Sequence, residues 1–227
     1  MERLNAINPA MVEFLRNVAS VILGWALGLG SASYTEWRKG RKRARAIKIA
    51  ISLELREIAL RLLMLAQLLE RRTGGLNRKT LEWMLPLIQR YAGPNPKDEL
   101  LAGVEGLLRS SDAELAQLAE HLQKTTPPSF IPHQEVSYTT TAVGQLHDQD
   151  PEYAARILDI LSHIRMFNDA RENGLYYLRL TFAPGLTDAN HQKAIANVLQ
   201  TEAQLAKRAR IIVEKISSVE DKFPQNA

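Results

Sequence analysis

Residues 17–35 read NVASVILGWALGLGSASYT, nineteen residues without a charged side chain. As a helix this stretch would be about 28 Å long, close to the roughly 30 Å thickness of the hydrocarbon layer of a bilayer. Tyr34 and Trp37 lie at its carboxyl end, a position where aromatic side chains often meet the membrane interface. The stretch therefore predicts a transmembrane helix over residues 17–37, after a short external tail of residues 1–16. Two alternatives stay open. One is a cleaved signal peptide, because Ser31, Ala32 and Ser33 look like a small-residue cleavage site. The other is a helix buried in a soluble core, because serines and glycines lower the apolarity of the stretch.

A basic juxtamembrane segment, residues 38–48, follows the predicted span. It holds seven of the 29 Lys and Arg and none of the 25 Asp and Glu, so the rest of the chain has 22 basic and 25 acidic residues. Because the basic excess is local, we expect no nucleic-acid partner. The positive-inside rule predicts a single-pass protein of the cell (inner) membrane, with its N-terminus outside and its C-terminal domain cytoplasmic. The segment either only sets this topology or also binds anionic lipid headgroups, through Arg38, Lys39, Arg41, Lys42, Arg43, Arg45 and Lys48.

Small residues recur at every fourth position within the predicted span. They are Ser20, Gly24, Gly28 and Ala32. Such a row lets two helix backbones approach closely in a membrane. It predicts a helix-association surface, although glycine is also simply frequent in membrane helices.

The remainder of the chain predicts an all-α cytoplasmic domain over residues 49–222, followed by a tail of residues 223–227. Apolar residues recur at spacings of three and four, and Gly and Pro separate the segments. Expected helices cover residues 44–72, 77–91, 97–109, 112–123, 136–146, 151–182 and 188–221. The three longest are expected to form an antiparallel bundle, with the helices of residues 77–147 covering one side. Capping residues are expected at Asn77, at Ser111 with Glu114, at Asp150 before Pro151, and at Thr187 or Asp188.

The last helix carries a seam of inward-facing positions that alternates threes and fours for more than three heptads. Glu202 is its one polar residue among Ile195, Val198, Leu205, Ala209, Ile212, Ile216 and Val219. Packing within the chain is the expected use of this seam, because the turn at Pro184 and Gly185 already supplies a neighbouring helix. Pairing with a second copy is the alternative.

Catalytic signatures are missing from the sequence. The chain has no cysteine, and its five histidines form no zinc-protease or di-iron motif. We therefore predict no catalytic residue, no cofactor and no metal. His163, Asn168 and Arg171 make a polar patch on an otherwise apolar helix, with Tyr176 and Tyr177 nearby. A solvated face or a buried polar group that fixes register is the favoured interpretation, and a ligand pocket is the alternative.

The order of motifs along the chain carries a resemblance. A span ending in YTEWRK at residues 34–39 is followed by LELRE at residues 53–57, SYT at residues 137–139 and PE at residues 151–152. This layout resembles a diffuse set of uncharacterised bacterial single-pass membrane proteins with helical cytoplasmic domains. The resemblance implies no activity and no catalytic residue. We expect a membrane-anchored interaction or scaffold protein that binds a protein partner or itself. The alternatives are a membrane-active defence or stress effector that associates through its span, and a membrane-surface enzyme.

Overall fold

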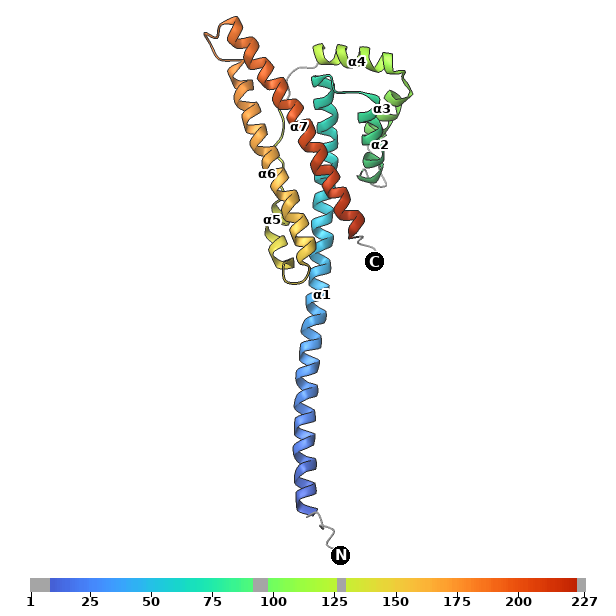
Figure 1. Cartoon of the computed structure of the whole chain (residues 1–227), viewed down its shortest axis with the longest axis vertical. Coiled ribbons are helices and arrows are strands. Elements are labelled where there is room, and N and C mark those ends of the chain that lie inside the picture. The colour runs from blue at the N-terminus through green and yellow to red at the C-terminus, as the bar shows by residue number, and fades with distance from the viewer. Residues whose placement is uncertain (1–8, 92–97, 126–129, 224–227) are drawn as a thin grey trace, which may run out of the picture. The chain divides into compact units, whose positions relative to one another are not determined.

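The protein is helical throughout the part that the structure describes. The computed structural model describes residues 9–91, 98–125 and 130–223, and every element in these ranges is a helix (Figure 1). The predicted all-α class is therefore confirmed. None of the described helices is both long enough and apolar enough to cross a membrane, and the transmembrane helix expected over residues 17–37 stays a prediction. The chain divides into two compact units, Met1–Ala46 and Ile47–Ala227.

Helix α1 is a single element of 65 residues, Pro9–Thr73. It contains the predicted span, the basic segment and the helix expected over residues 44–72, so the expected start at residue 44 is wrong. Ala, Lys and Arg are strong helix formers and fill residues 38–48 apart from Gly40 and Ile47, which explains why the helix continues through the basic segment. Of the predicted external tail, residues 9–16 are helical and residues 1–8 lie outside the described part.

The core of the second unit lies between the end of α1 and two long helices, α6 (Pro151–Leu180) and α7 (Asp188–Lys222). Ser52 of α1 faces Glu220 of α7, whereas Arg72 faces Glu202, so these two helices run antiparallel. Lys215 and Lys222 of α7 pair with successive acids of α6 in the same antiparallel sense (Figure 1). The predicted helical bundle is confirmed, and within it α1 and α6 run parallel to each other.

Buried residues follow the predicted stripes. On α1 they are Ile47, Ile51, Leu55, Ile58, Leu62, Leu65 and Leu69. On α7 every predicted seam position from Val198 to Val219 is buried, and Ile195 is half-buried. The seam therefore packs within the chain, as expected, and Glu202 is buried with it.

The shorter helices divide between two faces of the bundle, so the expectation that they cover one side is wrong. They are α2 (Arg78–Tyr91), α3 (Asp98–Arg109), α4 (Asp112–Thr125), α5 (Ser137–Ala142) and the 3₁₀ helix η1 (Val143–Leu146). Arg90 at the end of α2 reaches Glu220 of α7. In contrast, α5 is bonded to Glu54 of α1 and lies beside α6 (Figure 1). The chain passes from one face to the other between α4 and α5, and residues 130–136 belong to this connection.

Local signals placed most helix ends correctly. Asn77 accepts a hydrogen bond from the Thr80 N–H, Asp150 from the Tyr153 N–H, and Thr187 from the Asn190 N–H. Gly74 and Gly185 have positive φ angles of 73° and 80° in the turns that follow α1 and α6, a conformation that favours glycine. The break expected at residues 93–96 lies outside the described residues, as do residues 126–129 of the expected loop and residues 224–227 of the tail.

Candidate functional site

The first candidate site is the apolar part of α1. The large side chains that the structure describes there are exposed, with 70% of Val21 and 69% of Trp25 accessible. Leu23, at 61%, points to the opposite side of the helix. Ser20 and Ser31 donate their hydroxyls to the carbonyls of Asn17 and Gly28. These bonds satisfy the serine hydroxyls inside the helix without water.

The small-residue row lies on this part of α1. Ser20, Gly24 and Gly28 are exposed. A Cβ atom added at Gly24 or Gly28 would meet no atom within 4 Å apart from its own helix backbone. The side chain of Ala32 lies outside the described part. Nothing within the described chain therefore occupies the surface of the two glycines.

The basic segment is helical and most of it is exposed. The side chains of Arg38, Lys39, Arg41, Lys42, Arg43 and Arg45 all lie at the surface. Lys39 pairs with Glu36 at 3.2 Å, and the Arg41 guanidinium lies 4.2 Å from the centroid of the Trp37 ring. Trp37 in turn contacts Tyr34, with ring centroids 5.9 Å apart. An aromatic pair and a basic surface thus follow each other directly along one helix.

Lys48, the seventh predicted lipid contact, belongs to the second unit. It forms an ion pair with Asp150, the capping residue of α6, and its ammonium lies 5.0 Å from the centroid of the Tyr153 ring. Burial alone would raise the pKa of Asp150, but the hydrogen bonds from Lys48 and from the Tyr153 N–H lower it. Lys48 therefore joins α1 to the start of α6.

The predicted polar patch on α6 does not form one site. The Asn168 amide accepts from the Gln134 N–H at 3.0 Å and donates to the Gln134 carbonyl at 2.9 Å. Arg171 is buried and donates to the Ile131 carbonyl. His163 instead lies beside Asp159, whose carboxylate pairs with Lys215 of α7.

Asn168 and Arg171 thus fasten the connection of residues 130–136 onto α6, while His163 lies apart from them. This separation removes the geometric basis for a pocket built from all three residues. Tyr177 does line a polar groove of about 540 Å³ between α6 and α7, together with Asn173, Asn197 and Arg208. Tyr176 is exposed.

Among the ion pairs of the described residues, the pair with the least exposed side chains joins Glu202 to Arg72. Their side chains are 5% and 2% exposed, and an Arg72 Nη1 donates to Glu202. Burial raises the pKa of Glu202, although Arg72 opposes the shift. Glu202 stood out in the sequence as the polar interruption of the seam. Arg72 carries no comparable signal in the sequence, because an arginine in the last turn of a helix is common for electrostatic reasons alone.

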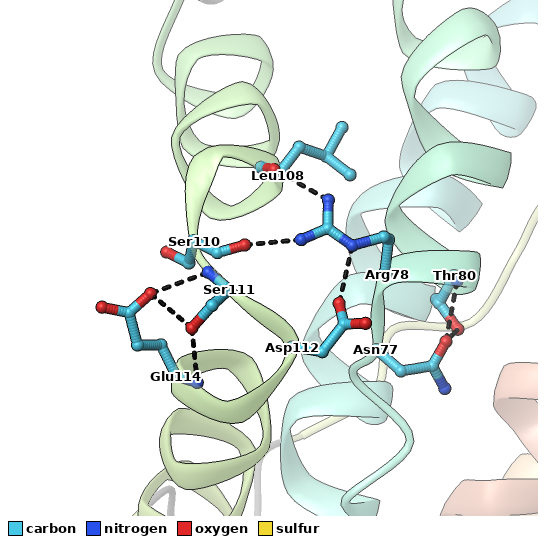
Figure 2. A network of polar contacts seen from close by, with 8 residues as sticks. All are labelled: Asn77, Arg78, Thr80, Leu108, Ser110, Ser111, Asp112 and Glu114. Carbon is cyan, nitrogen blue, oxygen red and sulfur yellow. Dashed lines mark hydrogen bonds and ion pairs between the residues drawn. The ribbon is translucent and has the colours of Figure 1, made fainter.

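A second polar network holds the corner between α3 and α4 (Figure 2). Arg78, at the start of α2, donates to the carbonyls of Leu108 and Ser110 at 2.9 Å and 2.6 Å, and pairs with Asp112 at 2.6 Å. The capping box predicted from Ser111 and Glu114 lies beside it. The Ser111 N–H donates to the Glu114 carboxylate at 2.7 Å, and the Glu114 N–H donates to the Ser111 hydroxyl at 3.3 Å.

No group of three or more potential metal ligands occurs among the residues that the structure describes. Comparisons with protein-family models, with curated proteins and with solved structures find no match to this chain.

Proposed function

We propose that the protein is a membrane-anchored helical interaction or scaffold protein, with its N-terminus outside and residues 38–227 in the cytoplasm. The observation that carries this proposal is the composition of the α1 surface. Exposed apolar side chains, including Val21 and Trp25, precede six exposed basic side chains on the same helix. Bilayer-spanning helices with a cytoplasmic basic flank have this order. The order of motifs, which resembles that of uncharacterised bacterial single-pass membrane proteins, agrees with it.

The distribution of apolar side chains around α1 favours a spanning helix over one that lies flat on the membrane. Val21 and Trp25 lie on one side and Leu23 on the opposite side, since each residue turns the helix by about 100°. A helix lying in the interface would carry a polar face along its length. The internally bonded hydroxyls of Ser20 and Ser31 also suit a medium without water.

Exposed aromatic side chains of the second unit support the interaction role. Phe182, in the turn between α6 and α7, is 80% accessible, and Phe130 and Tyr176 are also exposed. Aromatic residues are enriched where proteins contact each other. We expect Phe182→Ser to reduce the amount of protein partner that co-purifies from detergent-solubilised membranes. Lys193→Ser, which changes an exposed residue of α7, is the control and is expected to leave that amount unchanged.

Fusion of topology reporters to the C-terminus tests the orientation. A reporter that is active only in the cytoplasm is expected to be active, and one that is active only outside is expected to be silent. The opposite pattern overturns the proposed orientation.

The alternative function is a membrane-active effector whose copies associate through Ser20, Gly24, Gly28 and Ala32. The open surface of Gly24 and Gly28 favours it. Expression that depolarises the membrane, and that Gly24→Leu or Gly28→Leu abolishes, would support this alternative. Unchanged oligomeric state and growth in both variants would exclude it.

A further inference from the structure

Among the described residues, the contact of α7 with α1 contains one ion pair whose two side chains are both almost completely buried. Val198, Leu205 and Ile212 of α7 are buried along the seam, as are Leu62, Leu65 and Leu69 of α1. Arg72 and Glu202 are almost completely buried and form an ion pair 130 residues apart in sequence. The pair therefore places two opposite charges inside the buried contact between these helices.

Aliphatic contacts alone specify the register of two antiparallel helices weakly, because shifted positions offer similar side chains. A slip of α7 by one turn, about 5.4 Å, replaces one buried Ile, Leu, Val or Ala by another at most seam positions. At the level of the pair, a slip in one direction places Arg72 against Val198 and Glu202 against Leu69. A slip in the other direction places Arg72 against Leu205 and moves Glu202 past the end of α1. Burying an unpaired guanidinium and an unpaired carboxylate costs far more than exchanging aliphatic contacts.

The other polar contacts between α1 and the α6–α7 hairpin discriminate less between registers. Glu220 meets Arg56 at 3.8 Å and Ser52 at 3.4 Å. The Arg56 and Glu220 side chains are 44% and 15% exposed, against 2% and 5% for Arg72 and Glu202. Lys48 and Asp150 are also partly exposed. Water can solvate these groups when their partners move away, so their loss opposes a slip only weakly.

The hydrogen bonding of the pair is incomplete. Arg72 Nε and Glu202 Oε2 are both buried and have no hydrogen-bond partner among the residues that the structure describes. Buried ion pairs stabilise a fold only when their geometry and surrounding hydrogen bonds are good. The pair is therefore poorly suited to adding net stability.

We propose that the Arg72–Glu202 pair sets the register of α7 against α1 and excludes a bundle that is shifted by one helical turn. It acts as a conformational selector, and an aliphatic replacement would keep the fold while losing the single register. This inference does not depend on the proposed membrane function.

The experiment measures the distance between spin labels on α1 and α7 in the full-length chain. The chain has no cysteine, so labels attach only at Leu53→Cys and Gln204→Cys, two exposed positions. In the observed register these positions are offset by about 26 Å along the helices, and a one-turn slip changes that offset by about 5 Å. The variants are Arg72→Met/Glu202→Met and, as the matched control, the exchange Arg72→Glu/Glu202→Arg.

The unaltered pair and the exchanged pair are each expected to give one distance. The double Met variant is expected to remain folded, with a melting temperature no lower than that of the starting protein, and to give a second distance displaced by about 5 Å. A single, unchanged distance in the double Met variant overturns the proposal. Failure of this variant to fold also overturns it, because the pair would then be needed for stability.

Discussion

Removal of the Arg78 side chain is the sharpest test of how the α2–α4 part of the bundle is held. Its guanidinium spans the end of α3 and the start of α4 with three hydrogen bonds, two to backbone carbonyls and one to Asp112 (Figure 2). The carbonyls of Leu108 and Ser110 belong to a helix end, where carbonyls have no partner within the helix. Arg78→Ala therefore removes contacts from three elements at once.

The expected loss follows from the number and exposure of these bonds. A hydrogen bond contributes about 0.5–1.5 kcal/mol net, and the contact with Asp112 contributes less than about 1 kcal/mol because 79% of that side chain is exposed. Water can solvate the two freed carbonyls in part. We therefore expect Arg78→Ala to lower the free energy of unfolding by about 2 kcal/mol, and Arg78→Lys by about half of that, since an ammonium cannot reproduce the planar fork.

Urea unfolding of the full chain, followed by circular dichroism, measures the change. Lys79→Ala is the matched control, because Lys79 is the exposed neighbour of Arg78 on α2, and it is expected to change stability by less than about 0.5 kcal/mol. If Arg78→Ala and Lys79→Ala have equal effects, the α3–α4 corner is held by something other than this guanidinium.

Three further changes test other contacts of the second unit. Glu54→Ala removes the carboxylate that accepts from the Thr139 N–H and hydroxyl at the start of α5, and is expected to cost about 1–2 kcal/mol in urea unfolding. Asp150→Asn keeps a capping side chain but removes the charge that faces Lys48. The lowered pKa of Asp150 means that its contribution is complete above its unfolded pKa near 4 and is lost as the pH falls through the lower folded pKa, so the variant is expected to show a flatter stability profile below pH 4. Asn168→Ala is expected to accelerate hydrogen exchange of the Gln134 amide at least tenfold, since it removes the acceptor of that N–H.

Neighbouring exposed positions provide the controls for these three changes. Glu57→Ala on α1, Asp148→Asn before α6 and Asp169→Ala on α6 all replace exposed acids. Equal effects of Glu54→Ala and Glu57→Ala would show that α5 does not depend on the carboxylate of α1. An unchanged pH profile in Asp150→Asn would show that Lys48 does not depress the pKa of Asp150, and unchanged exchange at Gln134 would show that Asn168 does not hold residues 130–136.

Sequence reasoning succeeded where the physical signal is local. Helix ends at Ser111 and Asp150 depend on residues within one turn, and the buried stripe of α1 is visible as a spacing of threes and fours. The sequence does not predict that the span and the first bundle helix form one continuous helix, α1. The helix-forming residues of the basic segment nevertheless favour this continuity. The charge pattern instead predicts an end of the span at residue 37 and a separate helix from residue 44.

Long-range contacts could not be predicted from the sequence. Asn168 and Arg171 bond to backbone atoms of residues 131–134, and a backbone partner has no side-chain signature in the sequence. The partner of Glu202 lies 130 residues away, so only the packing of α1 against α7 identifies it. For the same reason, grouping His163 with Asn168 and Arg171 by their proximity along one helix suggested a site that the fold does not assemble.

The central claim, that the apolar part of α1 anchors the protein in a membrane, is tested most directly by carbonate extraction and flotation of membranes from cells that express the full chain. The unaltered protein is expected to float with the lipid after alkaline extraction. Val21→Asp/Leu23→Asp, which places a charge on each side of the helix, is expected to shift it to the soluble fraction, while Glu57→Ala leaves it in the membrane. Extraction of the unaltered protein by carbonate would contradict the claim.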